Sequence, residues 1–573
     1  MIPSVIVLGL NAGFAHDPAA ALLVDGRVVA AVEQERLSRR KHASGETPTD
    51  AARTCLAMGG VSSSDVDAVA YSWSPEELAR HRWAFVRRSL GRRPSKALRS
   101  VLGLSTRGDR PLTRLETTLD ELGIARAHTR VELVPHHLAH AASAVHFSGF
   151  DECAVLCIDG GGELTTCAFG SASGADIGLF HHIVRPDSLG FFYSAITDYL
   201  GFDVNDGEYK LMGMAAYGDP DRADLSGLLD WGGGDLRLDL RAIWPTKRHR
   251  YEGRRFGHEL VKRFGPPRVG DEIDEPYVHI AAATQQLFER AALHLVDHHL
   301  GSVLERTRRL CYAGGCALNV KMNRLLRDHP LVDRLFVPPS ADDAGTALGA
   351  ASLVAARAGD AIHPLRNAYL GPTFDSDDVA RALRARGVAA ERVADPAARA
   401  AALLADGEVV AWFQGAMEWG ARALGARSIL GHPGRRGTAD AINARIKCRE
   451  RWRPFCPSIL AERAADFLGS DHPSPYMTQA FALPRASAER TPEVVHVDGT
   501  ARPQTVTAEA SPLYHRLLSE FERRTGLPGV INTSLNRRGE PIVCTPDEAI
   551  EMFFGSDLDH LVIEDGHLRK TPA

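Results

Sequence analysis

Two histidines and two aspartates of this chain have the residue types and local settings of metal ligands. His136 and His140 are four positions apart, so an α-helix would present both imidazoles on one face. Asp159 follows an apolar run and precedes three glycines, and Asp343 precedes an apolar, alanine-rich run. Together they would form a mixed nitrogen and oxygen site that suits iron, manganese or zinc. The alternatives are a chance histidine pair, an Asp-Gly turn at Asp159 and a helix cap at Asp343.

His16 and two glycine-rich loops could bind and activate substrates beside such a site. His16 lies in an early loop, where a neutral imidazole could take the proton of an attacking hydroxyl, although a lone histidine is a weak signal. Glycine-rich loops leave backbone N–H groups open to a phosphate, and a loop that opens a helix attracts negative charge. The candidate nucleotide-binding residues in these loops are Gly160, Gly161, Gly314, Gly315 and Asn319. A plain turn is the alternative at each loop.

The C-terminal part gathers basic and amide side chains in several separate segments. A small dianion such as a phosphate monoester requires the charge-assisted hydrogen bonds that such groups donate. The candidate residues are Arg422, Arg427, Lys447, Arg453, Arg502, Asn532 and Arg538. A solvated basic face is the alternative, but these residues are interleaved with Trp452, Pro454 and Phe455 and not with other surface residues.

The elements that would position these residues are those of an α/β protein. Apolar runs predict strands over residues 5–10, 20–24, 28–33, 154–158 and 165–170, and long helices over 278–300 and 346–358. Asp25-Gly26 predicts a hairpin in the first group of strands, and the loop at 159–162 occupies a comparable place in the second. This weak internal repeat resembles the duplicated ribonuclease-H-like lobes of the actin, hexokinase and Hsp70 superfamily, which hold a nucleotide between the lobes.

A domain boundary is expected near residue 365. Residues 359–372 are rich in turn-forming residues, and a helix over 375–388 and a strand over 409–413 follow them. A length of 573 residues fits two to four domains. We therefore expect one domain at residues 1–360 and another at 365–573.

Composition is that of an ordinary globular protein. The chain is 44% hydrophobic and 24% charged, which disfavours disorder, and its net charge of −5 gives no global basic field for nucleic acid. The nine cysteines form no CxxC pair, and no apolar run reaches the ~18 residues of a membrane span. We expect a cytoplasmic protein that binds neither nucleic acid nor a membrane.

Ordered motifs along the whole chain resemble one family, the O-carbamoyltransferases of nodulation-factor, cephamycin, aminoglycoside and ansamycin biosynthesis. The carrying motifs include His16-Asp17, His136-His137-Leu-Ala-His140, Asp159-Gly-Gly-Gly-Glu163, Ser188-Leu-Gly, Lys210-Leu-Met-Gly, Gly314-Gly315, Arg422-Ala-Leu-Gly, Arg451-Trp-Arg453-Pro-Phe, Arg502-Pro-Gln-Thr-Val and Asn532-Thr-Ser.

The resemblance implies a reaction and a division of labour. The N-terminal domain resembles the universal tRNA threonylcarbamoyl-transfer subunit, and the C-terminal domain resembles the YrdC-like domain that makes a carbamoyl adenylate. Carbamoyl phosphate and ATP, with Mg²⁺, would bind among the basic residues of the C-terminal domain. A small-molecule hydroxyl of the antibiotic type would then accept the carbamoyl group.

The resemblance also implies roles for the N-terminal residues. His136, His140, Asp159 and Asp343 would hold a metal, with Fe(II) the first choice. The five loop residues Gly160, Gly161, Gly314, Gly315 and Asn319 would bind the adenylate. His16 would act as the base, and Lys41 would contact the acceptor or the nucleotide.

Three alternatives stay open at this stage. They are a tRNA threonylcarbamoyl-modifying enzyme, a kinase of the actin-like fold and a non-enzymatic ATP-gated binding protein. The basic stretch at residues 80–99 matches no general motif of the family; it is either a solvated amphipathic helix or a wall of the acceptor site. The sequence identifies neither the acceptor nor the oligomeric state.

Overall fold

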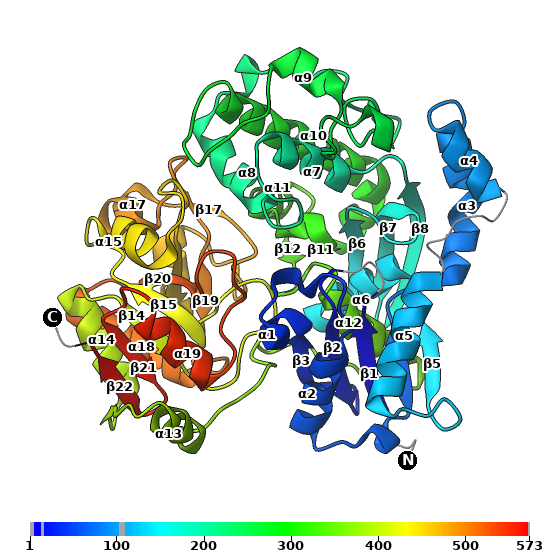
Figure 1. Cartoon of the computed structure of the whole chain (residues 1–573). Helices are drawn as coiled ribbons and strands as arrows, with labels where there is room; N and C mark the ends of the chain where they lie inside the picture. Colours follow the sequence, from blue (N-terminus) through cyan, green and yellow to red (C-terminus); the bar gives the residue numbers. More distant parts are fainter. Residues whose placement is uncertain (1–4, 13–15, 102–108, 571–573) are drawn as a thin grey trace. The chain divides into compact units, whose positions relative to one another are not determined.

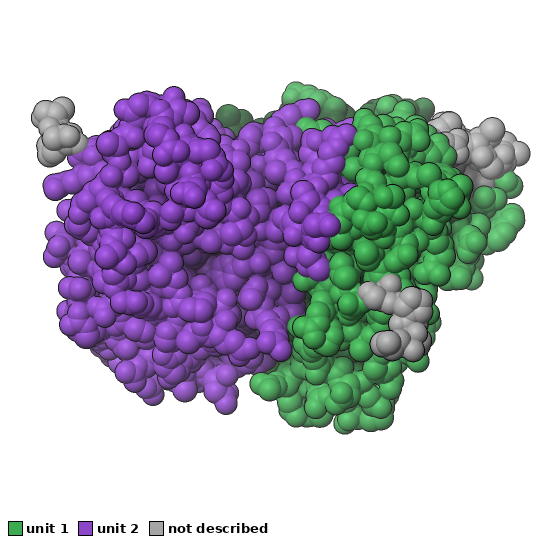
Figure 2. Space-filling view, turned by 90° about the horizontal axis from the view of Figure 1, so that it is seen from below, with its two compact units in different colours: residues 1–28, 46–49, 61–364 green, residues 29–45, 50–60, 365–573 purple. Residues whose placement is uncertain are grey.

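The computed structural model describes residues 5–12, 16–101 and 109–570. The chain divides into two compact units (Figure 2). Unit 1 comprises residues 1–28, 46–49 and 61–364, and unit 2 comprises residues 29–45, 50–60 and 365–573. Within the described ranges, no helix has the length and apolar character needed to cross a membrane.

The first sheet is built from β1 (Ile6–Asn11), β2 (Ala19–Val24), β3 (Arg27–Glu33), β4 (Ala68–Tyr71) and β5 (Arg130–Leu133). Its order is β3-β2-β1-β4-β5 (Figure 1). β1 pairs antiparallel with β2 and parallel with β4, and β4 pairs parallel with β5. Asp25 and Gly26 both adopt positive φ between β2 and β3, as the Asp-Gly pair predicts.

The second sheet repeats this topology. It contains β6 (Glu152–Ile158), β7 (Thr165–Ser173), β8 (Asp176–Val184), β11 (Arg309–Ala313) and β12 (Arg334–Phe336), in the order β8-β7-β6-β11-β12. β6 pairs antiparallel with β7 and parallel with β11, and β11 pairs parallel with β12. The matching strand order confirms the predicted α/β fold with duplicated lobes.

Helices α6 (His136–Ser148) and α12 (Gly345–Arg357) lie between the two sheets. α12 packs on β1 and β2, α6 packs on β6 and β11, and the two helices pack on each other (Figure 1). Gly349 makes this approach possible, because a Cβ atom added there would lie 1.9 Å from the carbonyl oxygen of Ala139. The close packing brings His136 and His140 near the start of α12.

The other elements of unit 1 surround this core. They are α3 (Pro75–Ser89), α4 (Pro94–Val101), α5 (Asp109–Leu122), α7 (Leu189–Tyr199), α8 (Glu208–Met214), the hairpin strands β9 (Leu229–Gly232) and β10 (Asp235–Leu238), α9 (His258–Phe264), α10 (Tyr277–Thr307) and α11 (Val320–Arg327).

Unit 2 is built on an eight-stranded sheet in the order β13-β22-β21-β14-β15-β20-β16-β19. Its strands are β13 (Glu391–Arg392), β14 (Val410–Phe413), β15 (Arg427–Gly431), β16 (Cys456–Leu460), β19 (Gln504–Val506), β20 (Gly529–Ser534), β21 (His560–Ile563) and β22 (Gly566–Arg569). One apolar cluster includes α13 (Ser376–Ala385) and α19 (Pro546–Phe554), and another includes α14 (Pro396–Asp406) and α18 (Pro512–Thr525). Shorter elements are α15 (Thr438–Ala441), α16 (Ala464–Leu468), α17 (Arg485–Arg490), β17 (Phe481–Ala482) and β18 (Thr500–Ala501).

Unit 2 also contains two early segments, which carry α1 (Gln34–Ser38) and most of α2 (Thr49–Gly59). Arg36 is 4% exposed and donates to the Gly420 carbonyl and to the Glu33 carboxylate. The Glu33 carboxylate in turn accepts from the Gly420 N–H, 2.8 Å away. These buried charged contacts join residues that the sequence-based boundary at 360–365 assigns to different domains.

Candidate functional site

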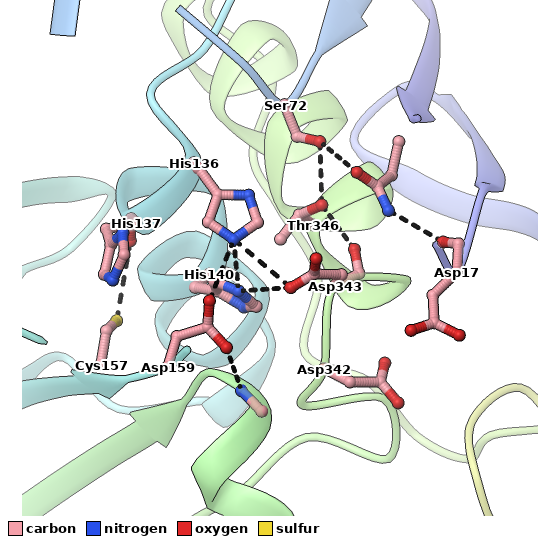
Figure 3. A network of polar contacts seen from close by, with 12 residues as sticks. Asp17, Ser72, His136, His137, His140, Cys157, Asp159, Asp342, Asp343 and Thr346 are labelled. Carbon is pink, nitrogen blue, oxygen red and sulfur yellow. Dashed lines mark hydrogen bonds and ion pairs between the residues drawn. The ribbon is translucent and has the colours of Figure 1, made fainter. Parts of the chain in front are cut away.

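Four side chains of unit 1 converge at the start of α6 and α12 (Figure 3). The Nε2 atoms of His136 and His140 are 3.0 Å apart. An Asp343 oxygen lies 3.4 Å from the first and 3.5 Å from the second, and an Asp159 oxygen lies 3.6 Å from His136 Nε2. All four residues are buried. The structure therefore brings together the whole ligand set that the sequence predicts.

The surrounding backbone holds these ligands in place. The buried Glu163 carboxylate accepts from the N–H groups of His136 and Ser74, so it anchors the first residue of α6. The two oxygens of Asp159 accept from the Gly161 and Gly315 N–H groups. The carboxylate of Asp343 leaves α12 without a side-chain cap, which excludes the capping alternative.

The charges of the cluster suit a divalent cation. Burial lowers the pKa of His136, but the Asp343 and Asp159 carboxylates outweigh it and raise the value to about 10. Burial and the neighbouring His136 lower the pKa of His140, so this imidazole is neutral. Although burial opposes ionisation, the imidazoles hold the pKa of both carboxyl groups below the usual range. Two carboxylates and two imidazoles thus offer a divalent metal a matched charge and the nitrogen and oxygen donors it prefers.

His16 lies beside this cluster. Its Nε2 atom is 3.6 Å from an Asp343 oxygen, and its Nδ1 atom is 2.9 Å from an Asp17 oxygen. Burial lowers the pKa of His16, but Asp343 and Asp17 outweigh it and raise the value to about 9. A cation held by Asp343 would oppose the proton on this imidazole and favour the neutral form that a base requires.

The glycine loops and Asn319 are already engaged with one another and with the cluster. Gly314 has φ of +98°, and a Cβ atom there would lie 2.3 Å from the Ile158 carbonyl, so only glycine allows this approach. The amide of Asn319 forms two 3.0 Å hydrogen bonds with the amide of Gln285, and its oxygen caps α11 at Met322. Asn319 therefore shapes the loop, and its amide would have to exchange partners to bind a nucleotide directly.

Lys447 is the centre of the basic group in unit 2. It is 5% exposed, and its Nζ atom donates to the Ser534 carbonyl at 2.8 Å and to the Asn536 carbonyl at 2.9 Å. Burial lowers its pKa well below the usual range, and Arg449, Arg453 and Lys41 lower it further. Lys41 thus belongs to unit 2 and acts electrostatically on Lys447, and its predicted contact with the acceptor or the nucleotide stays a prediction.

Arg427, a residue of the predicted anion-binding group, contacts backbone carbonyls in the structure. Its side chain is fully buried, and its five N–H bonds point at the backbone carbonyls of Pro372, Gln414, Gly415, Ala426 and Cys544. A guanidinium with every donor occupied has none left for a phosphate. Arg427 therefore holds the loop between β14 and β15, and its guanidinium would have to exchange partners to bind a phosphate directly.

The other predicted residues of unit 2 occupy four settings. Arg453 and Arg538 each pair with one oxygen of the buried Glu450 carboxylate. The distance is 3.5 Å from Arg453 Nη1 to Oε2 and 3.3 Å from Arg538 Nη2 to Oε1. The Nη2 atom of Arg502 is 2.9 Å from the thiol sulfur of Cys456. Asn532 donates to Ser458 Oγ at 2.9 Å inside the sheet, and Arg422 is half-buried on the β14–β15 loop.

Sequence reasoning missed three buried residues that position the site. Glu418 is 2% exposed and accepts from the N–H groups of Leu424, Ala426 and Arg427, so it shapes the loop that carries Arg422. Glu163 anchors His136, and Gln285 holds the Asn319 amide, but neither partner is close in sequence.

Comparisons with known proteins cover nearly the whole chain. Residues 6–352 match the family model described as carbamoyltransferase N-terminus, and residues 401–570 match carbamoyltransferase C-terminus. "Uncharacterized protein sll1178" of Synechocystis is 38% identical, over 99% of this chain and 97% of that protein. Nodulation protein NolNO of Sinorhizobium fredii is also 38% identical, over 99% of this chain and 81% of that protein. The crystal structure of T. kodakarensis HypF aligns with 63% of this chain and 49% of that chain, with a TM-score of 0.34 and 14% identity.

Proposed function

Since this chain belongs to the carbamoyltransferase family and is an enzyme that transfers a carbamoyl group, we propose that it uses carbamoyl phosphate and ATP to carbamoylate a hydroxyl of a small molecule. The observation that supports this most directly is the buried cluster of two histidines and two aspartates with His16 beside it. With a metal bound, this arrangement would place a Lewis acid next to a base, and acyl transfer to an alcohol can use both.

The first half-reaction would take place in unit 2. Carbamoyl phosphate is hydrolysed to carbamate and phosphate, and a carbamate oxygen attacks the α-phosphorus of ATP and expels pyrophosphate. Lys447, Arg453 and Arg538 lie on neighbouring segments that also contain Glu450, and they would bind the phosphate groups. Mg²⁺ would accompany ATP. The product is carbamoyl adenylate. Its AMP group is a good leaving group, whereas free carbamate has no comparable leaving group on its carbonyl carbon.

The second half-reaction would take place in unit 1. The acceptor hydroxyl adds to the carbamoyl carbon of the adenylate, His16 takes its proton, and AMP departs. Asp17 orients the His16 imidazole through its Nδ1 atom. A divalent cation held by His136, His140, Asp159 and Asp343, with Fe(II) the first choice, would supply Lewis-acid stabilisation of the charge that develops on the adenylate.

The test is the product balance of the purified full chain. ATP, carbamoyl phosphate and a panel of alcohols should give AMP, pyrophosphate and an acceptor heavier by one carbamoyl group in mass spectrometry. The panel should include sugars, aminoglycosides, macrocycles and lipooligosaccharides. Release of ADP would identify a phosphoryl-transferring enzyme instead, and a threonine requirement for ATP–pyrophosphate exchange would identify a tRNA-modifying enzyme.

A further inference from the structure

Arg93, between α3 and α4, is a buried arginine without a counter-ion. It is 4% exposed, and its Nε and Nη2 atoms have no hydrogen-bond partner among the described residues. The ranges outside the description contain no Asp or Glu, so no acidic side chain there could pair with it. A buried charge of this kind is costly unless something neutralises it.

The carboxylate that acts electrostatically on Arg93, that of Asp187, already pairs with two other arginines. Asp187 is fully buried, and its oxygens accept from Arg88 at 3.0 Å and from Arg92 at 2.9 and 3.0 Å. Burial, followed by the positive charges of Arg92 and Arg250, lowers the pKa of Arg93 to about 10. Arg88 and Arg92 pair with Asp187, whereas the buried Arg93 does not hydrogen-bond to it. The inward-facing arginines of residues 80–99 are therefore not simply the solvated face of a helix.

Arg93 and two further cationic side chains surround the indole ring of Trp244. The Trp244 centroid lies 5.8 Å from the Arg93 guanidinium carbon, 5.9 Å from Lys96 Nζ and 6.0 Å from the Arg185 guanidinium carbon. The Nε atom of the neighbouring Arg250 is likewise buried and unpartnered within the described part of the chain. A cation–π contact is worth far less than the desolvation of a guanidinium, so Trp244 does not account for this gathering of charge.

The cluster adjoins the metal centre. Arg185 Nη2 donates to the Gly161 carbonyl at 2.6 Å, and the Gly161 N–H donates to Asp159. One residue thus connects the cationic group to the loop beside the candidate metal ligands. A ligand that lies between them would reach both.

We propose that Arg93, Lys96, Arg185 and Arg250 around Trp244 form a binding site for an anionic group, a phosphate, sulfate or carboxylate, carried by the hydroxyl acceptor. The assignment to the acceptor rests on the proposed function. It follows from the positions of Arg93, Lys96, Trp244 and Arg250, which lie outside the family-like motifs quoted in the sequence analysis. Residues that bind ATP and carbamoyl phosphate, which the proposed reaction always uses, are expected in family-like motifs. Residues that recognise the acceptor are expected to vary and to lie outside them.

The site can be tested on the full chain without any transfer reaction. Inorganic phosphate, compared with sodium chloride at equal ionic strength, should raise the Tm by about 2 °C or more in the wild type. Arg93→Met should lose that part of the shift, and its ligand-free Tm should rise because an unpaired buried charge is gone. Arg87→Met, which removes an exposed arginine of α3, is the matched control and should keep the shift. Arg250→Gln, farther from the core, should reduce the shift as well.

The source of the anion is distinguished by repeating the titration with saturating AMP. If the site belongs to the acceptor, the Arg93-dependent shift persists with AMP bound. A shift that AMP abolishes would assign the cluster to the phosphate of the nucleotide and overturn the proposal, as would an equal shift in Arg93→Met and the wild type. Neither result depends on carbamoyl transfer, so the proposed function could fail while this site stands, or the reverse. Once an acceptor is known, Arg93→Met should raise its KM about 10- to 100-fold.

Discussion

At the scale of single residues, His16 is the side chain whose loss should separate the two half-reactions. It lies beside Asp343 in unit 1, next to the candidate metal ligands and not in the basic group of unit 2. His16→Asn should reduce carbamoyl transfer by ~10²–10⁴-fold, the usual effect of removing a general base. ATP–pyrophosphate exchange should persist. Loss of both activities together would contradict the role of His16, and His128→Asn, an exposed histidine, is the control.

Lys447 offers a second prediction at the same scale. Its compact ammonium is enclosed by the oxygens of Ser534 and Asn536, and the larger planar fork of arginine would not fit that space. Lys447→Arg should therefore abolish pyrophosphate exchange and lower the free energy of unfolding by about 1–3 kcal/mol. Lys262→Arg, on an exposed helix of unit 1, should change neither quantity. Normal exchange in Lys447→Arg would show that the ammonium is not required.

At the scale of elements, the contact between α6 and α12 determines the ligand geometry. The Cβ atom of Gly349→Ala would overlap the Ala139 carbonyl, so the helices would have to move apart. We expect the free energy of unfolding to fall by about 1–3 kcal/mol, and metal affinity measured by titration to fall with it. Gly301→Ala in α10 faces open space and should be neutral or stabilising. Unchanged metal affinity in Gly349→Ala would mean that the ligands do not depend on this contact.

Some elements could be predicted from the sequence, and others could not. Local signals predicted β1, β2, β6, the Asp25-Gly26 hairpin and the pair His136 and His140, because strand alternation and helical spacing are properties of neighbouring residues. The donors of Arg427 face backbone carbonyls, a setting that the residue type alone does not reveal. The contacts of Arg36 with Gly420 join distant parts of the chain, and no local pattern encodes them.

At the scale of the whole molecule, metal removal should act on one unit only. Chelation followed by restoration of Mg²⁺ should abolish carbamoyl transfer and leave ATP–pyrophosphate exchange, because the four candidate ligands are all in unit 1. Hydrogen exchange should increase at the start of α6 and at the loop before α12, since binding energy that stabilises the folded site is lost. Readdition of single divalent metals would then identify the active one. Loss of both activities on chelation, with exchange not restored by Mg²⁺, would contradict this separation.

The two early segments of unit 2 also affect the order in which the protein can fold during synthesis. Residues 29–45 and 50–60 leave the ribosome early, but their partners in unit 2 follow much later, since Gly420 lies 384 positions after Arg36 and Ile542 lies 503 positions after Arg39. Arg36 therefore stays solvated while residues 61–364 of unit 1 are synthesised, and it reaches its buried position only after Gly420 has been made. A gene fragment that encodes only residues 365–573 would leave the Gly420 loop without the charges that hold it, so co-expression of the N-terminal segments would be needed to restore it.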